Sequence, residues 1–174
     1  TIGAYTITYN VTDANNNAAN EVTRTVNVVD TTKPVIALVG DATVNIEAKD
    51  NYVDAGATAS DNYDGDLTAN IVTVNPVDTD NPGTYTITYN VTDANGNSAV
   101  EVTRTVNVID TTLPIISLVG DATVTVEVNG TYNDAGATAS DTLDGDITNS
   151  IVTVNPVDTI TVGSYTITYN VTDA

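Results

Sequence analysis

The chain has 174 residues, 41% of them hydrophobic, and it contains no Phe, Trp, Met, Cys or His. The lack of Cys and His excludes a disulfide framework, a zinc site with sulfur or imidazole ligands, a catalytic thiol and histidine-dependent catalysis. With 23 acidic and four basic residues, its formal charge is −19, which repels nucleic acid and anionic membrane surfaces and attracts cations.

Tandem repeats with a period of 80 residues organise the chain. Residues 31–94 match residues 111–174 at 45 of 64 positions, and residues 1–30 match residues 81–110 at 23 of 30. The ten-residue segment YTITYNVTDA occurs three times, beginning at Tyr5, Tyr85 and Tyr165. The chain therefore consists of copies of one structural unit.

The segments DTTKP, ending at Pro34, and DTTLP, ending at Pro114, lie where one strand pattern stops and the next starts. Proline does not fit a central strand, so we expect domain boundaries at these segments. Residues 1–30 then hold the C-terminal strands of a truncated repeat, residues 31–110 a complete repeat, and residues 111–174 a repeat that lacks its last strand.

Both ends of the sequence fall inside a repeat, so we expect the chain to be an excerpt of a longer array. The alternative is strand complementation, in which the incomplete end at Ala174 takes its missing strand from residues 17–29 of a neighbouring molecule.

Alternation of apolar and polar residues with period two runs through the complete repeat. Between residues 84 and 92, for example, tyrosine, isoleucine and valine occupy one face, and threonine and asparagine occupy the other. This pattern predicts strands, and no convincing helical period competes with it. The expected strands are 35–39, 43–48, 55–60, 69–75, 84–93 and 99–109, with turns at 40–41, 49–51, 61–66, 78–83 and 95–96.

Six short antiparallel strands in 80 residues predict an all-β fold, a sandwich of two sheets. We treat 35–39 and 43–48 as two segments of one split edge strand. If the chain then reverses at each turn, the loops 61–66 and 93–98 lie at the pole where the chain enters the repeat, beside Asp30. Three acidic segments would converge at this pole.

The sequence DNYDGD, residues 61–66, and its counterpart DTLDGD, residues 141–146, each place three carboxylates around a glycine that permits a sharp turn. Calcium takes six to eight oxygen ligands, so further ligands must come from the joint and from the neighbouring loop, with Asn95 as an additional candidate. We predict a calcium site at each joint, that is, at each of the two domain boundaries. The first is formed by Asp30, Asp61, Asp64, Asp66 and Asp93, and the second by Asp110, Asp141, Asp144, Asp146 and Asp173.

Two alternatives to calcium remain open. Short carboxylates also serve as turn residues, because they accept hydrogen bonds from nearby backbone N–H groups. Five carboxylates at one pole would however repel each other without a counter-ion. Magnesium is disfavoured because it prefers a near-ideal octahedron and keeps its waters.

Two further residue types stand out from the strand pattern. Arg24 and Arg104 fall on the apolar side of their strands, which predicts an ion pair at a bulge or a sheet edge rather than an anion site. Tyr85, two residues after Gly83, has the position of a tyrosine corner, which is a packing feature.

Three segments of the complete repeat, DTTKPVIALVGDATVNIE, DAGATASDNYDGDLT and GTYTITYNVTDANGNSAVEVTRTVNV, resemble the bacterial immunoglobulin-like repeats of large surface adhesins. The resemblance covers the whole repeat and, through the copies, the whole chain. It implies tandem immunoglobulin-like β-sandwich domains, a secreted or cell-surface location, and a spacer, adhesive or matrix role in a fibre or biofilm, often with bound calcium.

We therefore expect an extracellular structural spacer whose joints are stiffened by calcium, and no enzymatic activity. Its expected partners are neighbouring repeats of the same chain and other copies in a filament, with no nucleic acid and no membrane insertion, since no run of 18 apolar residues occurs. The alternative is an adhesive module that binds carbohydrate or protein. A glycosidase-like pair at Asp64 and Asp66 is disfavoured because the same group recurs in the next repeat.

Overall fold

A computed structural model describes all residues, 1–174, and confirms the all-β prediction. Its only helices are two three-residue 3₁₀ turns, η1 (Thr68–Asn70) and η2 (Thr148–Ser150). None is long and apolar enough to span a membrane. The strands are β1 (Gly3–Tyr9), β2 (Val22–Val28), β3 (Val35–Leu38), β4 (Thr43–Glu47), β5 (Ala57–Asp61), β6 (Gly65–Asp66), β7 (Val72–Val74), β8 (Gly83–Asn90), β9 (Val102–Ile109), β10 (Ile115–Leu118), β11 (Ala137–Asp141), β12 (Gly145–Asp146), β13 (Val152–Val154) and β14 (Thr168–Asn170).

The chain divides into two compact units, and the division runs through the strands of the complete repeat. The first unit comprises residues 1–43, 54–76 and 86–105, and the second comprises residues 44–53, 77–85 and 106–174.

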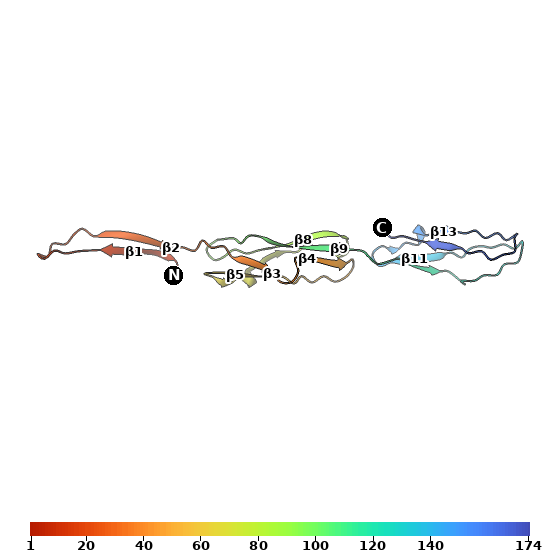
Figure 1. The fold of residues 1–174 in the computed structure, drawn as a ribbon, viewed down its shortest axis with the longest axis horizontal. Helices are drawn as coiled ribbons and strands as arrows, with labels where there is room; N and C mark the ends of the chain where they lie inside the picture. The colour runs from red at the N-terminus through yellow and green to blue at the C-terminus, as the bar shows by residue number, and fades with distance from the viewer. The chain divides into compact units, whose positions relative to one another are not determined.

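In the first unit, β1 and β2 form an antiparallel hairpin with a register from Gly3 opposite Val28 to Tyr9 opposite Val22 (Figure 1). β-Branched residues and tyrosine favour this pleated pairing. Apart from Gly3, which is half-buried, every residue of the two strands is exposed. The hairpin thus has the alternation of apolar and polar residues that is typical of a half-buried sheet, although nearly all of its residues are exposed.

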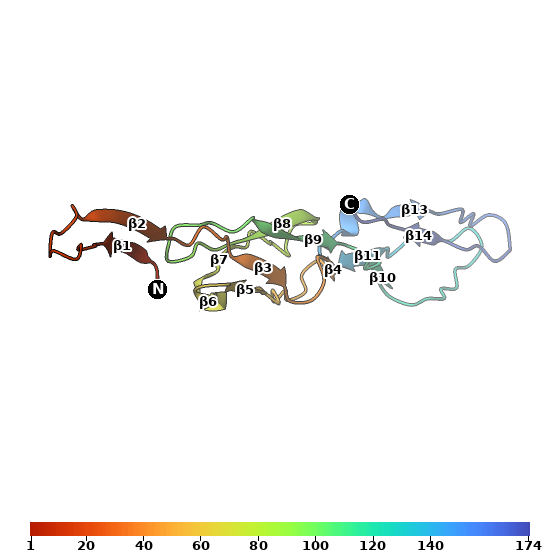
Figure 2. The same cartoon turned by 60° about the vertical axis from the view of Figure 1, so that its left-hand side comes forward.

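The complete repeat, through which the division runs, has the predicted two-sheet arrangement. One sheet has the order β3–β5–β6, and the other has the order β4–β9–β8–β7 (Figure 2). Ile36 and Ala59 supply buried side chains from the first sheet, and Ile87 and Tyr89 supply them from the second. The predicted sandwich is therefore confirmed, and its acidic loops are held at the ends of ordered strands.

The segment predicted as a split edge strand changes sheets. β3 pairs with β5, whereas β4 is the edge of the four-stranded sheet next to β9. Gly40, with a positive φ of 78°, lies between them and allows the chain to turn at this point.

In the second unit, β10, β11 and β12 repeat the order and register of β3, β5 and β6. β13 pairs with β14, as β7 pairs with β8, but only residues 168–170 of the expected strand are ordered as a strand. Residues 123–127, which align with β4, form none. The reason is that β9 lies between β4 and β8 in the complete sheet, and residues 111–174 contain no counterpart of β9.

Candidate metal centre

The turn after β5 is built around Asp61. One carboxylate oxygen of Asp61, Oδ1, accepts hydrogen bonds from the backbone N–H of Tyr63 at 2.7 Å and of Asp64 at 3.1 Å. Gly65 then adopts a φ of 76°, which lets the chain fold back into β6. The sequence DNYDGD thereby brings the carboxylates of Asp61 and Asp64 to one side of a tight loop.

The turn that follows β8 is built around Asp93 in the same way. Its Oδ1 accepts hydrogen bonds from the backbone N–H groups of Asn95 and Asn97, and its Oδ2 accepts one from the side-chain amide of Asn97 at 2.7 Å. Burial alone would raise the pKa of Asp93, but the Asn97 side chain and the backbone N–H groups lower it below its usual value. Asp93 is therefore buried and held in its charged form.

Direct hydrogen bonds connect the two loops and the joint. The backbone N–H of Ala94 donates to Oδ2 of Asp64 at 3.0 Å. The side-chain amide of Asn95 donates to Oδ2 of Asp30 at 3.2 Å, and that of Asn97 donates to the backbone carbonyl of Asp30 at 3.4 Å. The joint residue is thus tied to the loops of the repeat that follows it.

Four carboxylates converge at this place. One oxygen from each of Asp30, Asp61, Asp64 and Asp93 lies within 4.8 Å of the others. Asp61 is only 9% exposed, and its Oδ2 is buried without a hydrogen-bond partner. A buried, charged oxygen without a partner is costly, and the repulsion of three neighbouring carboxylates adds to that cost. A divalent cation would relieve both.

The second unit contains a corresponding cluster formed by Asp110, Asp141 and Asp144, with ligand atoms within 4.8 Å of one another. Asp141 is again 9% exposed, with a buried Oδ2 that has no partner. Burial raises the pKa of Asp110, and the charges of Asp141, Asp173 and Glu47 raise it further. The same unbalanced negative charge therefore recurs one period along the chain.

Three of the ten predicted ligands lie outside these clusters. Asp66 is exposed, and its Oδ1 accepts a hydrogen bond from the N–H of Thr68 at 2.9 Å; Asp146 does the same with Thr148 at 3.0 Å. Both are turn residues at the start of a 3₁₀ helix. Asp173 is near enough to raise the pKa of Asp110 but does not join the group of ligand atoms.

Sequence reasoning did not single out Asn97, and the prediction of Asn95 as an additional ligand stays a prediction. Asn95 donates its amide to Asp30, and Asn97 orients Asp93. The sequence carried a signal for Asn97, because the first copy has Asn17 at the aligned position. In the structure Asn17 makes the same bond to Asp13, at 2.9 Å.

Comparison with known proteins identifies the family to which this architecture belongs. The model of the family "Bacterial surface protein, Ig-like domain" matches residues 36–108 and 116–174. The chain belongs to this family. The family match confirms the immunoglobulin-like fold class and the resemblance to bacterial surface proteins.

Relatives of this immunoglobulin-like chain are longer proteins. It is 34% identical over 185 residues to an 81.3 kDa protein of Acholeplasma phage L2, a match that covers 100% of this chain and 24% of that protein. It is 29% identical over 181 residues to hyalin of Strongylocentrotus purpuratus, covering 99% of this chain and 15% of hyalin. The chain thus spans about a quarter or less of these relatives.

Among solved structures, it is similar to a lipoprotein from Bacteroides thetaiotaomicron. The two share 24% sequence identity with a TM-score of 0.40, over 49% of this chain and 45% of the lipoprotein.

The complete immunoglobulin-like domain also buries an arginine. Arg104 of β9 is 1% exposed and forms an ion pair with Asp54. Its Nη1 donates to the hydroxyl of Tyr89 at 3.1 Å, and that hydroxyl donates to Oδ2 of Asp54 at 2.7 Å. Its Nε donates to the carbonyl of Asp41 at 2.9 Å. The ion pair was predicted, but its place was wrong: β9 lies between β4 and β8, so the pair is internal and not at a sheet edge.

The tyrosine-corner prediction fits the observed bonds. The hydroxyl of Tyr85 donates to the backbone carbonyl of Asn81 at 2.8 Å, and Tyr5 and Tyr165 make the same bond four residues upstream in their own copies.

Proposed function

We propose that this chain is an extracellular structural spacer of a bacterial surface protein, without catalytic activity, in which calcium binds at the joint that opens each repeat. Membership of the surface-protein family supports the location and the role. The observation that carries the calcium proposal is the buried, unpartnered Oδ2 of Asp61, repeated at Asp141.

The residues present fit calcium. Carboxylate oxygens are hard ligands, and calcium accepts them in irregular numbers and geometries, whereas magnesium demands a near-ideal octahedron. Asp30, Asp61, Asp64 and Asp93 would hold the first ion, and Asp110, Asp141 and Asp144 the second. Bound calcium would supply positive charge that offsets the repulsion and fixes the joint residue to the two loops.

The competing explanation is that these aspartates only shape turns. Asp66 and Asp146 fit that explanation, since each uses its carboxylate for a turn bond and lies outside the clusters. Asp61 does not fit it fully. Both of its turn bonds go to one oxygen, and the other oxygen is buried with no partner.

The test removes one carboxylate oxygen from Asp61 and from Asp141 and keeps the other. Asp61→Asn with Asp141→Asn keeps an Oδ1 acceptor for the turn but removes the charge and the free oxygen. Wild type should gain thermal stability when calcium replaces a chelator, by about 1.4 kcal/mol per site at about 1 mM calcium and a dissociation constant of about 10⁻⁴ M. The variant should show no gain.

The matched control is Asp66→Asn with Asp146→Asn, which removes the same charge from the same loops. It should respond to calcium as wild type does. Equal responses of the two double variants, or a wild type that does not respond at millimolar calcium, would contradict the proposal.

A further inference from the structure

We propose that Glu47, at the end of β4, is a positioning residue for the second acidic cluster, which is formed by Asp110, Asp141 and Asp144. Calcium binding at this cluster is then coupled to the repeat that precedes the joint. The inference rests on the proposed function, because it concerns regulation of the same site. Glu47 and the three aspartates all lie in the second compact unit.

Three hydrogen bonds tie the carboxylate of Glu47 to the joint. Its Oε1 accepts from the backbone N–H of Thr111 at 2.7 Å and from the hydroxyl of Thr112 at 3.0 Å, and its Oε2 accepts from the hydroxyl of Thr111 at 2.8 Å. Beside it, the backbone N–H of Ala48 donates to the carbonyl of Ile109 at 2.7 Å. The end of β4 thus holds the chain on both sides of the cluster residue at position 110.

The cluster residue Asp110 is held by the same segment. The backbone N–H of Thr112 donates to Oδ1 of Asp110 at 3.2 Å, so Thr112 bonds to Asp110 through its backbone and to Glu47 through its hydroxyl. The same turn occurs at the first joint, where the backbone N–H of Thr32 donates to Oδ1 of Asp30 at 3.0 Å. The turn itself is therefore a property of the joint sequence, and Glu47 adds its connection to β4.

Glu47 is not a ligand in this arrangement. Both of its oxygens accept hydrogen bonds from the joint, and it lies outside the group of ligand atoms within 4.8 Å of one another. Its role is to hold Asp110 in place beside Asp141, whose Oδ2 is buried without a hydrogen-bond partner. A binding group that is fixed in advance loses less conformational entropy when the ion binds, which raises the affinity.

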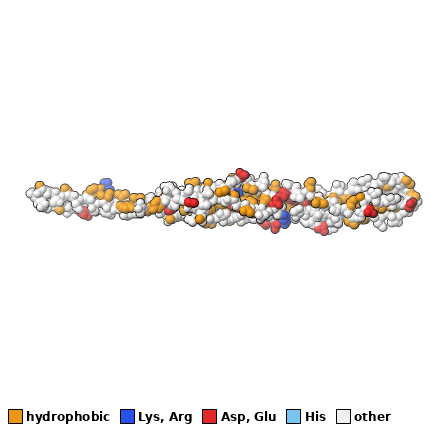
Figure 3. Space-filling model, turned by 90° about the horizontal axis from the view of Figure 1, so that it is seen from below, with side chains coloured by type: hydrophobic (Ala, Val, Ile, Leu, Met, Phe, Trp, Pro, Cys, Tyr) orange, Lys and Arg blue, Asp and Glu red, His pale blue; other side chains and the backbone are white.

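The charge of Glu47 acts in the same direction as its hydrogen bonds. Burial raises the pKa of Asp110, and the charges of Asp141, Asp173 and Glu47 raise it further. Neither ion pair of the protein includes any of these four residues. Figure 3 shows acidic side chains at several places on the face in view and basic ones at few. A cation at the cluster would reduce the repulsion among these carboxylates, and the negative charge of Glu47 would help to attract it.

The coupling is reciprocal. If the bonds between Glu47 and the joint raise the affinity for calcium, bound calcium strengthens those bonds by the same factor. β4 is the edge of the four-stranded sheet of the complete repeat. Calcium at the second joint would therefore secure the edge strand of the repeat before the joint as well as the loop of the repeat after it.

The experiment examines one metal site at a time in the full chain. Asp61→Asn leaves the second site intact, and Asp141→Asn leaves the first site intact. Glu47→Gln is added to each, and calcium affinity is measured by isothermal calorimetry. The affinity of the second site should fall by about 5-fold or more, the lower end of typical coupling between sites. The affinity of the first site should not change, which also shows that the complete repeat is folded in the variant.

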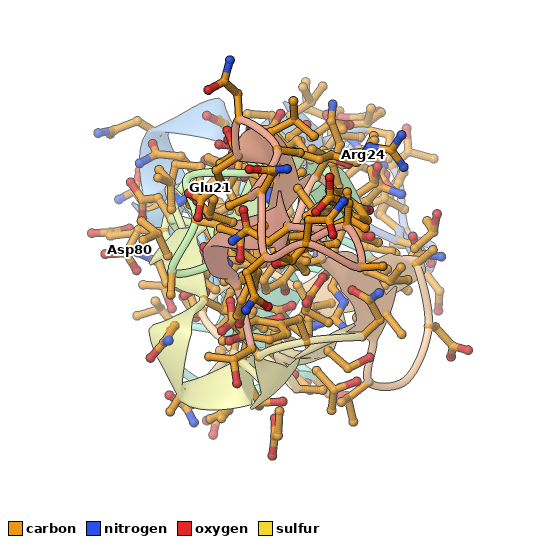
Figure 4. The ribbon with its side chains drawn as sticks, turned by 90° about the vertical axis from the view of Figure 1, so that its left-hand side faces the viewer. Glu21, Arg24 and Asp80 are labelled. Carbon is orange, nitrogen blue, oxygen red and sulfur yellow. The ribbon has the colours of Figure 1, made fainter.

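The matched control is Asp80→Asn, which removes the same charge from the same compact unit without touching the joint. Asp80 is exposed and pairs with Lys49 at 3.1 Å, and Figure 4 shows it at the outer edge of the view. Added to Asp61→Asn, this change should leave the affinity of the second site as it was. Equal weakening by Asp80→Asn and Glu47→Gln would overturn the proposal, because net charge and not position would then set the affinity.

The same titrations distinguish failure of this inference from failure of the proposed function. If neither Asp61→Asn nor Asp141→Asn binds calcium, both fall together. If both bind calcium and Glu47→Gln leaves the second site unchanged, or weakens both sites equally, the inference alone is overturned and the calcium sites stand.

Discussion

Arg104 shows how one polar residue is accommodated in the interior of a small β-sandwich. Its guanidinium is paired with Asp54, hydrogen-bonded to the Tyr89 hydroxyl, and lies 5.8 Å from the centre of the Tyr89 ring. Buried charge is tolerated only when each donor and acceptor is matched. The contribution of this group to stability therefore depends on all of its bonds being present.

Replacing Arg104 with methionine keeps most of the side-chain volume but leaves the Asp54 carboxylate without its cation. We expect the free energy of unfolding to fall by about 3–5 kcal/mol, measured by urea denaturation. The control is Lys49→Met, which breaks the exposed ion pair between Lys49 and Asp80. That change should cost less than about 1 kcal/mol. Equal losses from the two variants would contradict the structural role of Arg104.

Glu47 anchors the end of β4 to the second joint. Its carboxylate accepts hydrogen bonds from the backbone N–H and hydroxyl of Thr111, at 2.7 and 2.8 Å, and from the hydroxyl of Thr112 at 3.0 Å. The bonds from Thr111 lower the pKa of Glu47 below its ordinary value of 4.5. The stabilisation is therefore fully present above that ordinary value and is lost as the pH falls through the lowered pKa.

The corresponding prediction concerns Glu47→Gln, studied with a chelator. Its melting temperature should lie below that of wild type at neutral pH, and the difference should disappear as the pH falls below the lowered pKa. A difference that stays constant with pH would show that the charge of Glu47 contributes nothing.

At the scale of single residues, the sequence predicted which acids gather but not what each carboxylate oxygen does. Reversal of the chain at each turn was enough to bring Asp30, Asp61, Asp64 and Asp93 to one pole. It did not exclude Asp66. This residue lies two positions after Asp64 on the same tight loop, but its carboxylate accepts a hydrogen bond from the backbone N–H of Thr68 instead of joining the cluster. Such detail depends on local dihedral angles that a repeat pattern does not encode.

At the scale of elements, nearly identical sequences form different structures according to their neighbours. The segment at 163–170 forms a strand only over its last three residues, whereas its counterpart β8 is a strand throughout. Period-two alternation therefore predicts the capacity to form a strand, and the neighbouring strands decide its length: β8 lies between β9 and β7, whereas β14 pairs with β13 alone. The limits of β5 and β9 differ from those predicted by a few residues.

Hydrogen exchange tests this dependence on context. The amides of Val22–Val28 should exchange near the rate of an unfolded chain. The nearly identical amides of Val102–Ile109 should be protected by about 1000-fold or more, because β9 opens only with its domain. Equal protection of the two strands would show that the hairpin is stable without a second sheet.

At the scale of the whole molecule, the formal charge of −19 is unevenly compensated. Two of the four basic residues form ion pairs, and neither pair includes an acidic residue of the two clusters. In a spacer built of such repeats, one cation at each joint would offset local repulsion and connect successive domains. This is the central claim, and it concerns stoichiometry as much as affinity.

The most direct measurement is a calcium titration by isothermal calorimetry of wild type, Asp61→Asn, Asp141→Asn and the double variant. We predict two bound ions for wild type, one for each single variant and none for the double variant. Absence of binding to wild type at millimolar calcium, or two ions still bound by the double variant, would contradict the claim.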